Sequence, residues 1–269
     1  MTGMRAELHR DDDGWTLPVL RSDRIPGDLR HGFSTRAGGV SAAPFDALNL
    51  GGKWGDDPAA LAENRRRFAR ALGVAGPLFA VRQVHGAEVV RVRAGEDPAA
   101  LGAVDADAIC ADAPGVAVGV FVADCIPALF ADPTTGAVAA AHAGWRGVVA
   151  GVLPATVRAL AALGARPADL RVALGPAIGP CCFEVGGEVV AAFAAAELAG
   201  AVRPSPRGRP DRWHIDLKDA ARRQLEGAGV DPAGIDAAAD CTSCDRARFY
   251  SFRRDGRATG QLMGVIGRP

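Results

Sequence analysis

The stretch FVADCIPALFADPTTGAVAAAHAGWRG, residues 121–147, decides the architecture at the centre of this chain. It connects two apolar segments, 116–122 and 136–142, whose residues are mostly small or β-branched on both faces. Such segments are typical of strands that are buried on both sides of a sheet. Cys125 follows the first segment and His142 ends the second, so we expect both side chains at the ends of buried strands.

The remaining elements mix strands and helices without a regular βαβ order. The patterns predict further strands at 15–22, 31–35, 78–84, 87–93, 107–110, 169–176, 248–256 and 261–267, and helices at 57–73, 146–163, 186–199 and 217–227. Asp57 and Pro58 are typical of a helix start, and Pro154 is expected to bend the second helix. The order favours an α+β fold, with residues 1–269 forming a single compact layered domain of mixed β-sheets flanked by helices.

Composition and charge narrow the class of protein. The chain has 269 residues, of which 49% are hydrophobic and 23% charged, so it can bury a large core. Its net charge is zero, which gives no reason to expect a nucleic-acid partner. The N-terminus lacks an apolar signal, and the apolar stretch at 115–130 is interrupted by Asp124, Cys125 and Pro127. We therefore expect a soluble, cytoplasmic protein with no membrane partner.

Three dispersed residues form the candidate metal site. His85 precedes Gly86 at an expected strand end, as Cys125 and His142 lie at others, and Pro127 is expected to stop regular pairing just after Cys125. Two imidazoles and a thiolate suit zinc, and catalytic zinc sites commonly use three protein ligands. The alternative is that each residue is an ordinary part of the core, because widely spaced ligands make no compact motif.

The other cysteines give a weaker signal. Cys241 and Cys244 have the Cys-x-x-Cys spacing of a zinc ribbon, but a second such pair is missing, and Cys181 and Cys182 are adjacent. The spacing therefore favours ordinary thiols at all four positions.

Eight short fragments along the chain carry a resemblance to a known family. Fragments occur along the chain in the order HGFSTRAGGVS, NLG…GDD…ENR, RQVHG, DADAIC, ADCIPALFADP, AAAHAGWRG, LGPAIGPCCFEVG and FYSFRRDGRATGQLMGVI. Together they closely resemble the laccase-domain family, over about residues 31–266. Its members were first labelled multicopper polyphenol oxidases and are now regarded as purine nucleoside phosphorylases.

The resemblance implies a zinc site made of His85, Cys125 and His142. It also implies phosphorolysis of adenosine, inosine, guanosine and methylthioadenosine, together with deamination of adenosine, so purine nucleosides and phosphate are the expected small-molecule partners. The implied fold is a compact α/β sandwich. Where the family more often has Arg in its closing motif, this chain has Gln261, which puts the role of that Arg in doubt.

Several residues are candidates for the chemistry. Deamination needs a general acid, for which Asp124 beside Cys125 is one candidate and Glu184 another. These carboxylates can equally be structural, since structural carboxylates outnumber catalytic ones.

Substrate binding needs an anion site and contacts to ribose. Arg36 and Arg146, which lie inside family motifs, are candidates for phosphate binding. Asn49 lies in the Gly-rich loop at 36–57. It is a candidate for ribose recognition or for shaping the turn of that loop.

Two rival chemistries use the same residues. A multicopper oxidase needs many paired imidazoles, whereas the chain has five histidines and no His-x-His pair, so only a single copper replacing zinc remains open. A cysteine hydrolase with Cys125 as nucleophile and His142 as base also remains open.

Overall fold

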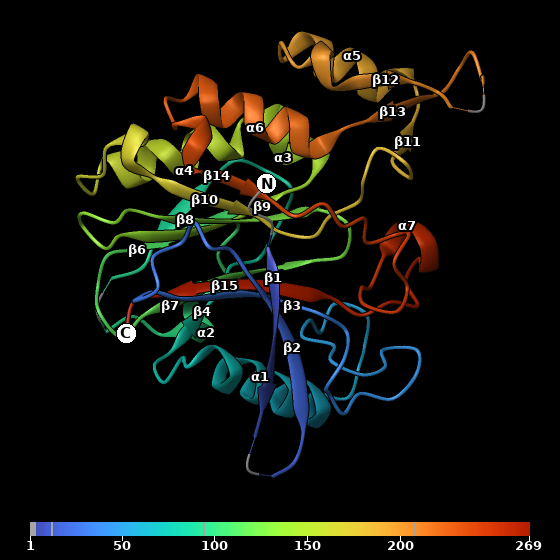
Figure 1. Cartoon of the computed structure of the whole chain (residues 1–269). Coiled ribbons are helices and arrows are strands. Elements are labelled where there is room, and N and C mark those ends of the chain that lie inside the picture. Colours follow the sequence, from blue (N-terminus) through green and yellow to red (C-terminus); the bar gives the residue numbers. More distant parts are fainter. Residues whose placement is uncertain (1–3, 12, 94, 207) are drawn as a thin grey trace.

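The computed structural model describes residues 4–269 except 12, 94 and 207, and arranges them in layers (Figure 1). Two sheets lie face to face at the centre. Helix α1 (Pro58–Leu72) covers one of them, and α3 (Trp145–Ala150), α4 (Val152–Ala161) and α6 (Leu217–Gly227) form a layer over the other (Figure 1). Mixed sheets flanked by helices confirm the predicted α+β class.

The sheet that α1 covers has six strands. Their order is β1 (Arg5–Arg10), β2 (Thr16–Arg21), β3 (Arg30–Ser34), β15 (Leu262–Gly267), β7 (Ala117–Val122) and β4 (Leu78–Phe79). All neighbours are antiparallel except β4 and β7.

The second six-stranded sheet holds the strands around the quoted stretch. Its order is β14 (Ile235–Ala237), β10 (Arg171–Leu174), β8 (Ile126–Ala131), β9 (Val138–Ala143), β6 (Ala108–Ala111) and β5 (Val89–Arg91). The outer pairs β10–β14 and β5–β6 are parallel, and the inner pairs are antiparallel. The short helix α2 (Pro98–Leu101) lies between β5 and β6 in the chain.

A small three-stranded sheet stands at one end of the molecule. It consists of β11 (Glu184–Val185), β13 (Trp213–Ile215) and β12 (Val202–Pro204), with α5 (Gly187–Ala195) beside it (Figure 1). Short 3-10 turns at Pro167–Asp169, Ala199–Ala201 and Pro232–Gly234 complete the elements before the last helix.

The central strands are buried on both faces, as their sequence predicts. In β9, Val138 and Ala140 pack between the two sheets, while Ala139 and Ala141 face the helices. All residues of β8 and β9 are buried. Small side chains on both faces let a sheet and a helical layer approach the same strand, which is the physical reason for the Ala-rich run.

The predicted start of α1 is confirmed. The side chain of Asp57 accepts a hydrogen bond from the backbone N–H of Ala59, and Pro58 occupies the first turn, where a missing N–H costs nothing. Gly73 ends the helix with φ 73°, a left-handed conformation that glycine adopts without strain. None of the helices in the described part of the chain has the length and apolarity needed to cross a bilayer.

Four expectations about local structure are wrong. Pro127 does not stop pairing: it is the second residue of β8, opposite His142 of β9, and its carbonyl accepts from the Gly175 N–H at 2.9 Å. A proline is tolerated near the first residues of a strand because few ladder bonds are lost there.

The helix expected at 146–163 is two helices. They are separated by Gly151 in the left-handed conformation, with φ 84°. Pro154 lies in the first turn of α4, where its missing N–H would have no helical partner, so it causes no bend. The strand expected at 248–256 is instead the short helix α7 (Phe252–Asp255), which begins where the Ser251 hydroxyl caps the N–H of Arg254.

Candidate metal centre

The structure brings His85, Cys125 and His142 together. One ligand atom from each lies within 4.8 Å of the others, and the two imidazole rings meet edge to face with centroids 4.7 Å apart. Each residue comes from a different segment of the chain. His85 precedes β5, Cys125 lies at the bend between β7 and β8, and His142 is the fifth residue of β9.

Unusual backbone conformations present these side chains. His85 has φ 64° and the neighbouring Asp124 has φ 88°, both in the left-handed region that non-glycine residues rarely adopt. Gly144 lies beside the cluster. A Cβ at this position would stand 2.8 Å from Cys125 Sγ and 3.0 Å from His85 Cδ2, so only glycine leaves room for the two side chains.

Asp107, to which no motif of the sequence assigns a function, organises the cluster. It is fully buried just before β6, and its Oδ1 lies 2.7 Å from His142 Nδ1. The same carboxylate accepts the backbone N–H groups of Val84, His85 and Gly86. It therefore fixes the ring of one candidate ligand and the backbone of another, leaving His142 Nε2 available to an ion. The one sequence feature that could have indicated this role is the position of Asp107, a charged residue directly before the buried strand β6.

The electrostatics of the cluster favour an ionised sulfur. Burial alone would raise the pKa of Cys125, but the charge of His142 and hydrogen bonds with His142 and His85 lower it below its usual value. Burial likewise opposes a charged His142, yet the Cys125 thiolate and Asp107 raise its pKa. A stabilised thiolate is both the form that binds metals and the form that attacks electrophiles.

A cavity of about 630 Å³ contains the cluster, a size typical of small-molecule sites. Its walls combine aromatic and cationic side chains with the candidate ligands. The aromatic ones are Trp54, Phe121, Trp145, Phe183 and Phe252, and the cationic ones are Lys53, Arg82, Arg146 and Arg253. Trp54 and Phe252 stack with centroids 5.7 Å apart and 19° between their planes.

Two of the other predicted residues also line this cavity. Arg146 is exposed, and its guanidinium lies 4.3 Å from the centroid of the Trp145 ring. Asp124 is buried, and both of its carboxylate oxygens already accept hydrogen bonds: one from the Thr242 hydroxyl at 2.6 Å, the other from Ser251 and from the N–H of Arg253. This geometry gives Asp124 a positioning role, because it ties the wall of the cavity to the bend beside Cys125.

The placement of Asn49 does not support the predicted contact with ribose, because it is outside the described cavity lining. Its side chain is buried and donates to Asp56 at 2.9 Å. Its amide oxygen accepts the N–H groups of Gly51 and Gln261. Asn49 therefore shapes the loop, and it also holds Gln261, which lines the cavity.

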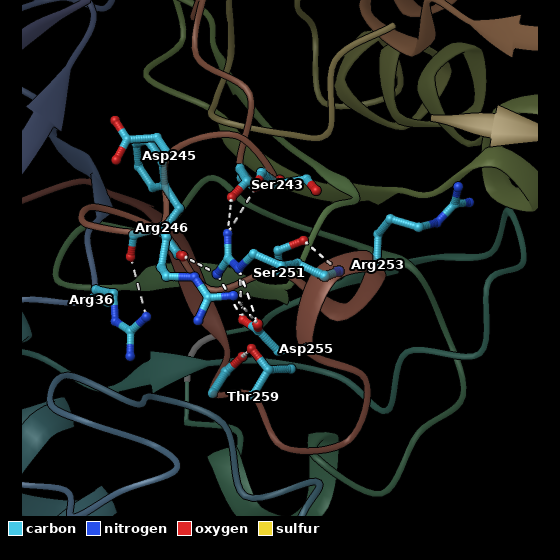
Figure 2. Close-up of polar contacts among 12 residues, drawn as sticks. Arg36, Ser243, Asp245, Arg246, Ser251, Arg253, Asp255 and Thr259 are labelled. Atoms are coloured by element: carbon cyan, nitrogen blue, oxygen red, sulfur yellow. Dashed lines mark hydrogen bonds and ion pairs between the residues drawn. The ribbon is translucent and has the colours of Figure 1, made fainter. Parts of the chain in front are cut away.

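Arg36 and Glu184 are also outside the described lining. Arg36 donates to the carbonyls of Asp46 and Arg246, the latter visible in Figure 2, and lies over the Tyr250 ring. Glu184 forms an ion pair with Arg209. A phosphate-binding role for Arg36 and a proton-donating role for Glu184 are therefore not supported by their positions.

The four remaining cysteines considered for zinc binding lie together, although their spacing along the chain did not predict a cluster. The sulfur atoms of Cys181, Cys182, Cys241 and Cys244 all lie within 4.8 Å of one another. Spacing along the chain concealed this cluster, because it forms only when two distant turns pack together.

Comparisons with known proteins identify the family of this chain. The family model described as multi-copper polyphenol oxidoreductase laccase matches residues 30–269. A protein of Deinococcus radiodurans named purine nucleoside phosphorylase is 44% identical over 254 residues, covering 94% of each chain. The Escherichia coli protein named purine nucleoside phosphorylase YfiH is 41% identical, covering 87% of this chain and 91% of the relative.

A solved structure shows the same architecture. The crystal structure of YlmD from Geobacillus stearothermophilus superposes with a TM-score of 0.85 at 35% identity, covering 98% of this chain and 99% of that one. The match to the family model over nearly the whole chain, with relatives above 40% identity, shows that this protein belongs to the laccase-like family of polyphenol oxidoreductases and purine nucleoside phosphorylases.

Proposed function

We propose that this protein is a zinc-dependent purine nucleoside phosphorylase that also deaminates adenosine. The observation that carries the proposal is the convergence of His85, Cys125 and His142 in one cavity with stacked aromatic and cationic side chains. Relatives that carry the name purine nucleoside phosphorylase give the substrate class. Adenosine, inosine, guanosine and methylthioadenosine are the proposed nucleosides.

The donor set fits a zinc ion. Two imidazoles and one thiolate leave a fourth position of a tetrahedral site for another ligand, as in catalytic zinc sites. Asp107 orients His142 in the way that carboxylates commonly orient zinc-binding histidines. When bound, the ion would supply Lewis acidity towards an oxygen atom in the cavity. Copper(II) is expected to replace zinc at such a site in vitro, because it binds nitrogen and sulfur donors more tightly.

The aromatic walls suit the purine. Trp54 and Phe252 offer flat apolar surfaces at the cavity, and stacking on such side chains recognises any purine without selecting one base. This is consistent with a range of nucleoside substrates.

The cationic walls suit phosphate. In phosphorolysis, a phosphate oxygen bonds to the anomeric carbon of ribose while the carbon–nitrogen bond to the purine breaks. The electron pair of that bond leaves with the base, which then takes up a proton. Arg146 and Arg253 line the cavity and can hold the phosphate through charge-assisted hydrogen bonds. Arg146 therefore remains a proposed substrate-binding residue.

In deamination, water adds at C6 of adenine and ammonia departs after taking up a proton. Deamination acts at C6 and phosphorolysis at the bond from N9 to ribose of the same nucleoside, so one cavity that binds the nucleoside is proposed to serve both reactions. Asp124 is proposed to hold the cavity wall for both, rather than to donate a proton, because its oxygens are occupied by Thr242, Ser251 and Arg253.

A cysteine hydrolase is the second candidate, and the mutual stabilisation of the Cys125 thiolate and the His142 imidazolium favours it. The two candidates predict opposite responses to metal. A zinc-bound Cys125 should resist alkylation by iodoacetamide until a chelator is added, whereas a free nucleophilic thiolate should react at once.

The deciding experiment uses adenosine with and without phosphate. Wild-type protein should release adenine only when phosphate is present, and should form inosine in its absence. His85→Ala, Cys125→Ala and His142→Ala should each abolish adenine release, while Cys110→Ala, a buried thiol outside the cluster, should retain it. Full turnover in all three cluster variants would exclude the proposal.

A further inference from the structure

Two turns meet at the wall of the cavity and bring four cysteines together. One turn contains Cys181 and Cys182 and the other runs from Cys241 to Cys244. An isolated parallel bridge between Ala177 and Cys241 aligns the two segments, and the N–H of Thr242 donates to the Ala177 carbonyl. Adjacent cysteines can both face the second turn because the first turn curves tightly: the N–H groups of Cys182 and Phe183 both donate to the Gly179 carbonyl.

The sulfur positions match a tetrahedral ion. Cys244 Sγ lies 3.5 Å from Cys181 Sγ and 3.3 Å from Cys182 Sγ, and all four sulfurs fall within 4.8 Å. Four sulfurs around a zinc ion with Zn–S bonds of about 2.3 Å stand about 3.8 Å apart. The observed distances are far longer than a disulfide bond of about 2.05 Å, and the cysteines are free thiols.

The surroundings suit a site with net negative charge. The backbone N–H of Gly179 donates to Cys241 Sγ at 3.2 Å, the kind of contact that supports a metal-bound thiolate. The ammonium of Lys218 donates to the carbonyls of Ala238 and Asp240, directly before Cys241. The guanidinium of Arg253 donates to the Cys182 carbonyl at 3.3 Å. Zinc with four thiolates carries two negative charges, which these two cations would offset.

The cluster is also connected to the cavity. Ile178 and Phe183 flank the first turn and line the cavity, and Thr242 in the second turn donates to Asp124 beside Cys125. Arg254 reinforces this wall by donating to the carbonyls of Thr242, Ser243 and Phe249, part of the network drawn in Figure 2. An ion that joined the two turns would therefore fix one wall of the cavity.

We propose that Cys181, Cys182, Cys241 and Cys244 bind a second, structural zinc ion that joins these turns. Four protein ligands leave no open position, so the ion stabilises the cavity wall and takes no part in the reaction. The inference rests on this cluster alone and stands independently of the proposed function.

Metal content of freshly purified, reduced protein provides the test. Wild type should contain about two zinc equivalents per chain, and Cys125→Ala and Cys244→Ser should each contain about one. The double variant Cys125→Ala/Cys244→Ser should contain almost none. Cys110→Ala is the matched control, because Cys110 is outside both clusters, and it should keep both ions.

Two further measurements keep the outcome clear if a variant is unstable. In cadmium-substituted wild type, NMR of the metal should show an all-sulfur signal well downfield of any site with two nitrogen ligands. In the Cys125→Ala variant, a chelator should lower the melting temperature, since removing a structural ion removes its contribution to folding.

Contrary results are equally clear. The proposal is overturned if Cys244→Ser retains the wild-type zinc content or if no all-sulfur cadmium signal appears. It is also overturned if the mass of the non-reduced chain is lower by two hydrogens, because a disulfide bond has formed within the cluster and no metal is bound there. A wild type with only the all-sulfur signal would instead exclude the zinc site at His85, Cys125 and His142.

Discussion

Asp107 Oδ1 lies 2.7 Å from His142 Nδ1, and the same carboxylate accepts the backbone N–H of His85. One buried side chain therefore positions two of the three candidate ligands. Asp107 lies just before β6, and β6 pairs with β9, the strand that carries His142. This pairing explains how Asp107 reaches His142 although the two residues are distant in sequence.

Replacing Asp107 should loosen the metal site before it affects the rest of the fold. In the wild type, the backbone N–H groups of Val84, His85 and Gly86 all donate to the carboxylate of Asp107. In Asp107→Asn, an NH2 group replaces one of the two accepting oxygens, so some of these bonds are lost. We expect zinc affinity to fall by about 10- to 100-fold, the usual effect of removing a residue that orients a ligand. Competition with a chromophoric chelator measures this.

The matched control is Asp112→Asn. Asp112 directly follows β6 and pairs with Arg91 at the surface, so its loss should leave zinc affinity unchanged. Equal affinities in wild type and Asp107→Asn would show that the carboxylate does not support the site.

Gly144→Ala should exclude the metal by sterics alone. The added methyl group would stand 2.8 Å from Cys125 Sγ, so the sulfur or the backbone has to move. We expect the variant to fold but to contain less zinc and to lose turnover. Elemental analysis measures the zinc content, and circular dichroism checks that the chain is folded.

Gly227→Ala provides the comparison for that substitution. Gly227 ends α6 in an exposed position where a Cβ meets nothing within 4 Å. Alanine there should stabilise the helix by up to about 1 kcal/mol and leave zinc content unchanged. A Gly144→Ala protein with full zinc content would refute the steric argument.

The elements that local sequence determines were predictable. The start of α1, the strands buried on both faces and the three candidate ligands follow from turn chemistry, apolar patterns and family motifs. The position of Asp107 was not, because it depends on which distant backbone N–H groups the fold brings to its side chain. For Asn49 the sequence left two alternatives open, and the contacts of its side chain favour the shaping of the loop. The four-cysteine cluster escaped detection for the same reason as Asp107. Its two turns are aligned by the bridge between Ala177 and Cys241, which has no periodic signature.

Phe252→Ala should weaken nucleoside binding with little effect on the chemical step. Phe252 stacks on Trp54 at the cavity and is 47% exposed, so its removal leaves no core void. If the purine stacks there, the loss of about 1–3 kcal/mol should raise KM by roughly 5- to 150-fold while kcat changes little. Steady-state kinetics with adenosine and inosine measure the split.

Leu8→Ala is the control for that variant, because Leu8 is an exposed apolar residue of β1, 56% exposed, and outside the cavity lining. It should leave both constants unchanged. If Phe252→Ala does the same, the purine does not rest on this pair.

His31 should make the stability of the fold depend on pH below neutrality. The ring is buried, with Nε2 near the backbone N–H and carbonyl of Ser22, and burial followed by the charge of Arg21 lowers its pKa to about 4. In the unfolded chain the pKa is about 6.5, so between these values only the unfolded state binds the proton. Stability from the neutral ring is therefore complete above about pH 6.5 and is lost as the pH falls towards 4, by at most about 3 kcal/mol.

His31→Gln isolates this contribution, because an amide can donate to and accept from Ser22 without titrating. The difference in free energy of unfolding between the two proteins at pH 7.5, measured by urea unfolding, gives the cost of the substitution itself and serves as the reference. At pH 5 the wild type should have lost about 2 kcal/mol more than the variant, since one proton per chain favours its unfolded state across most of that interval. Parallel pH profiles would mean that the pKa of His31 is the same in the folded and unfolded chains, and would refute the claim that burial lowers it.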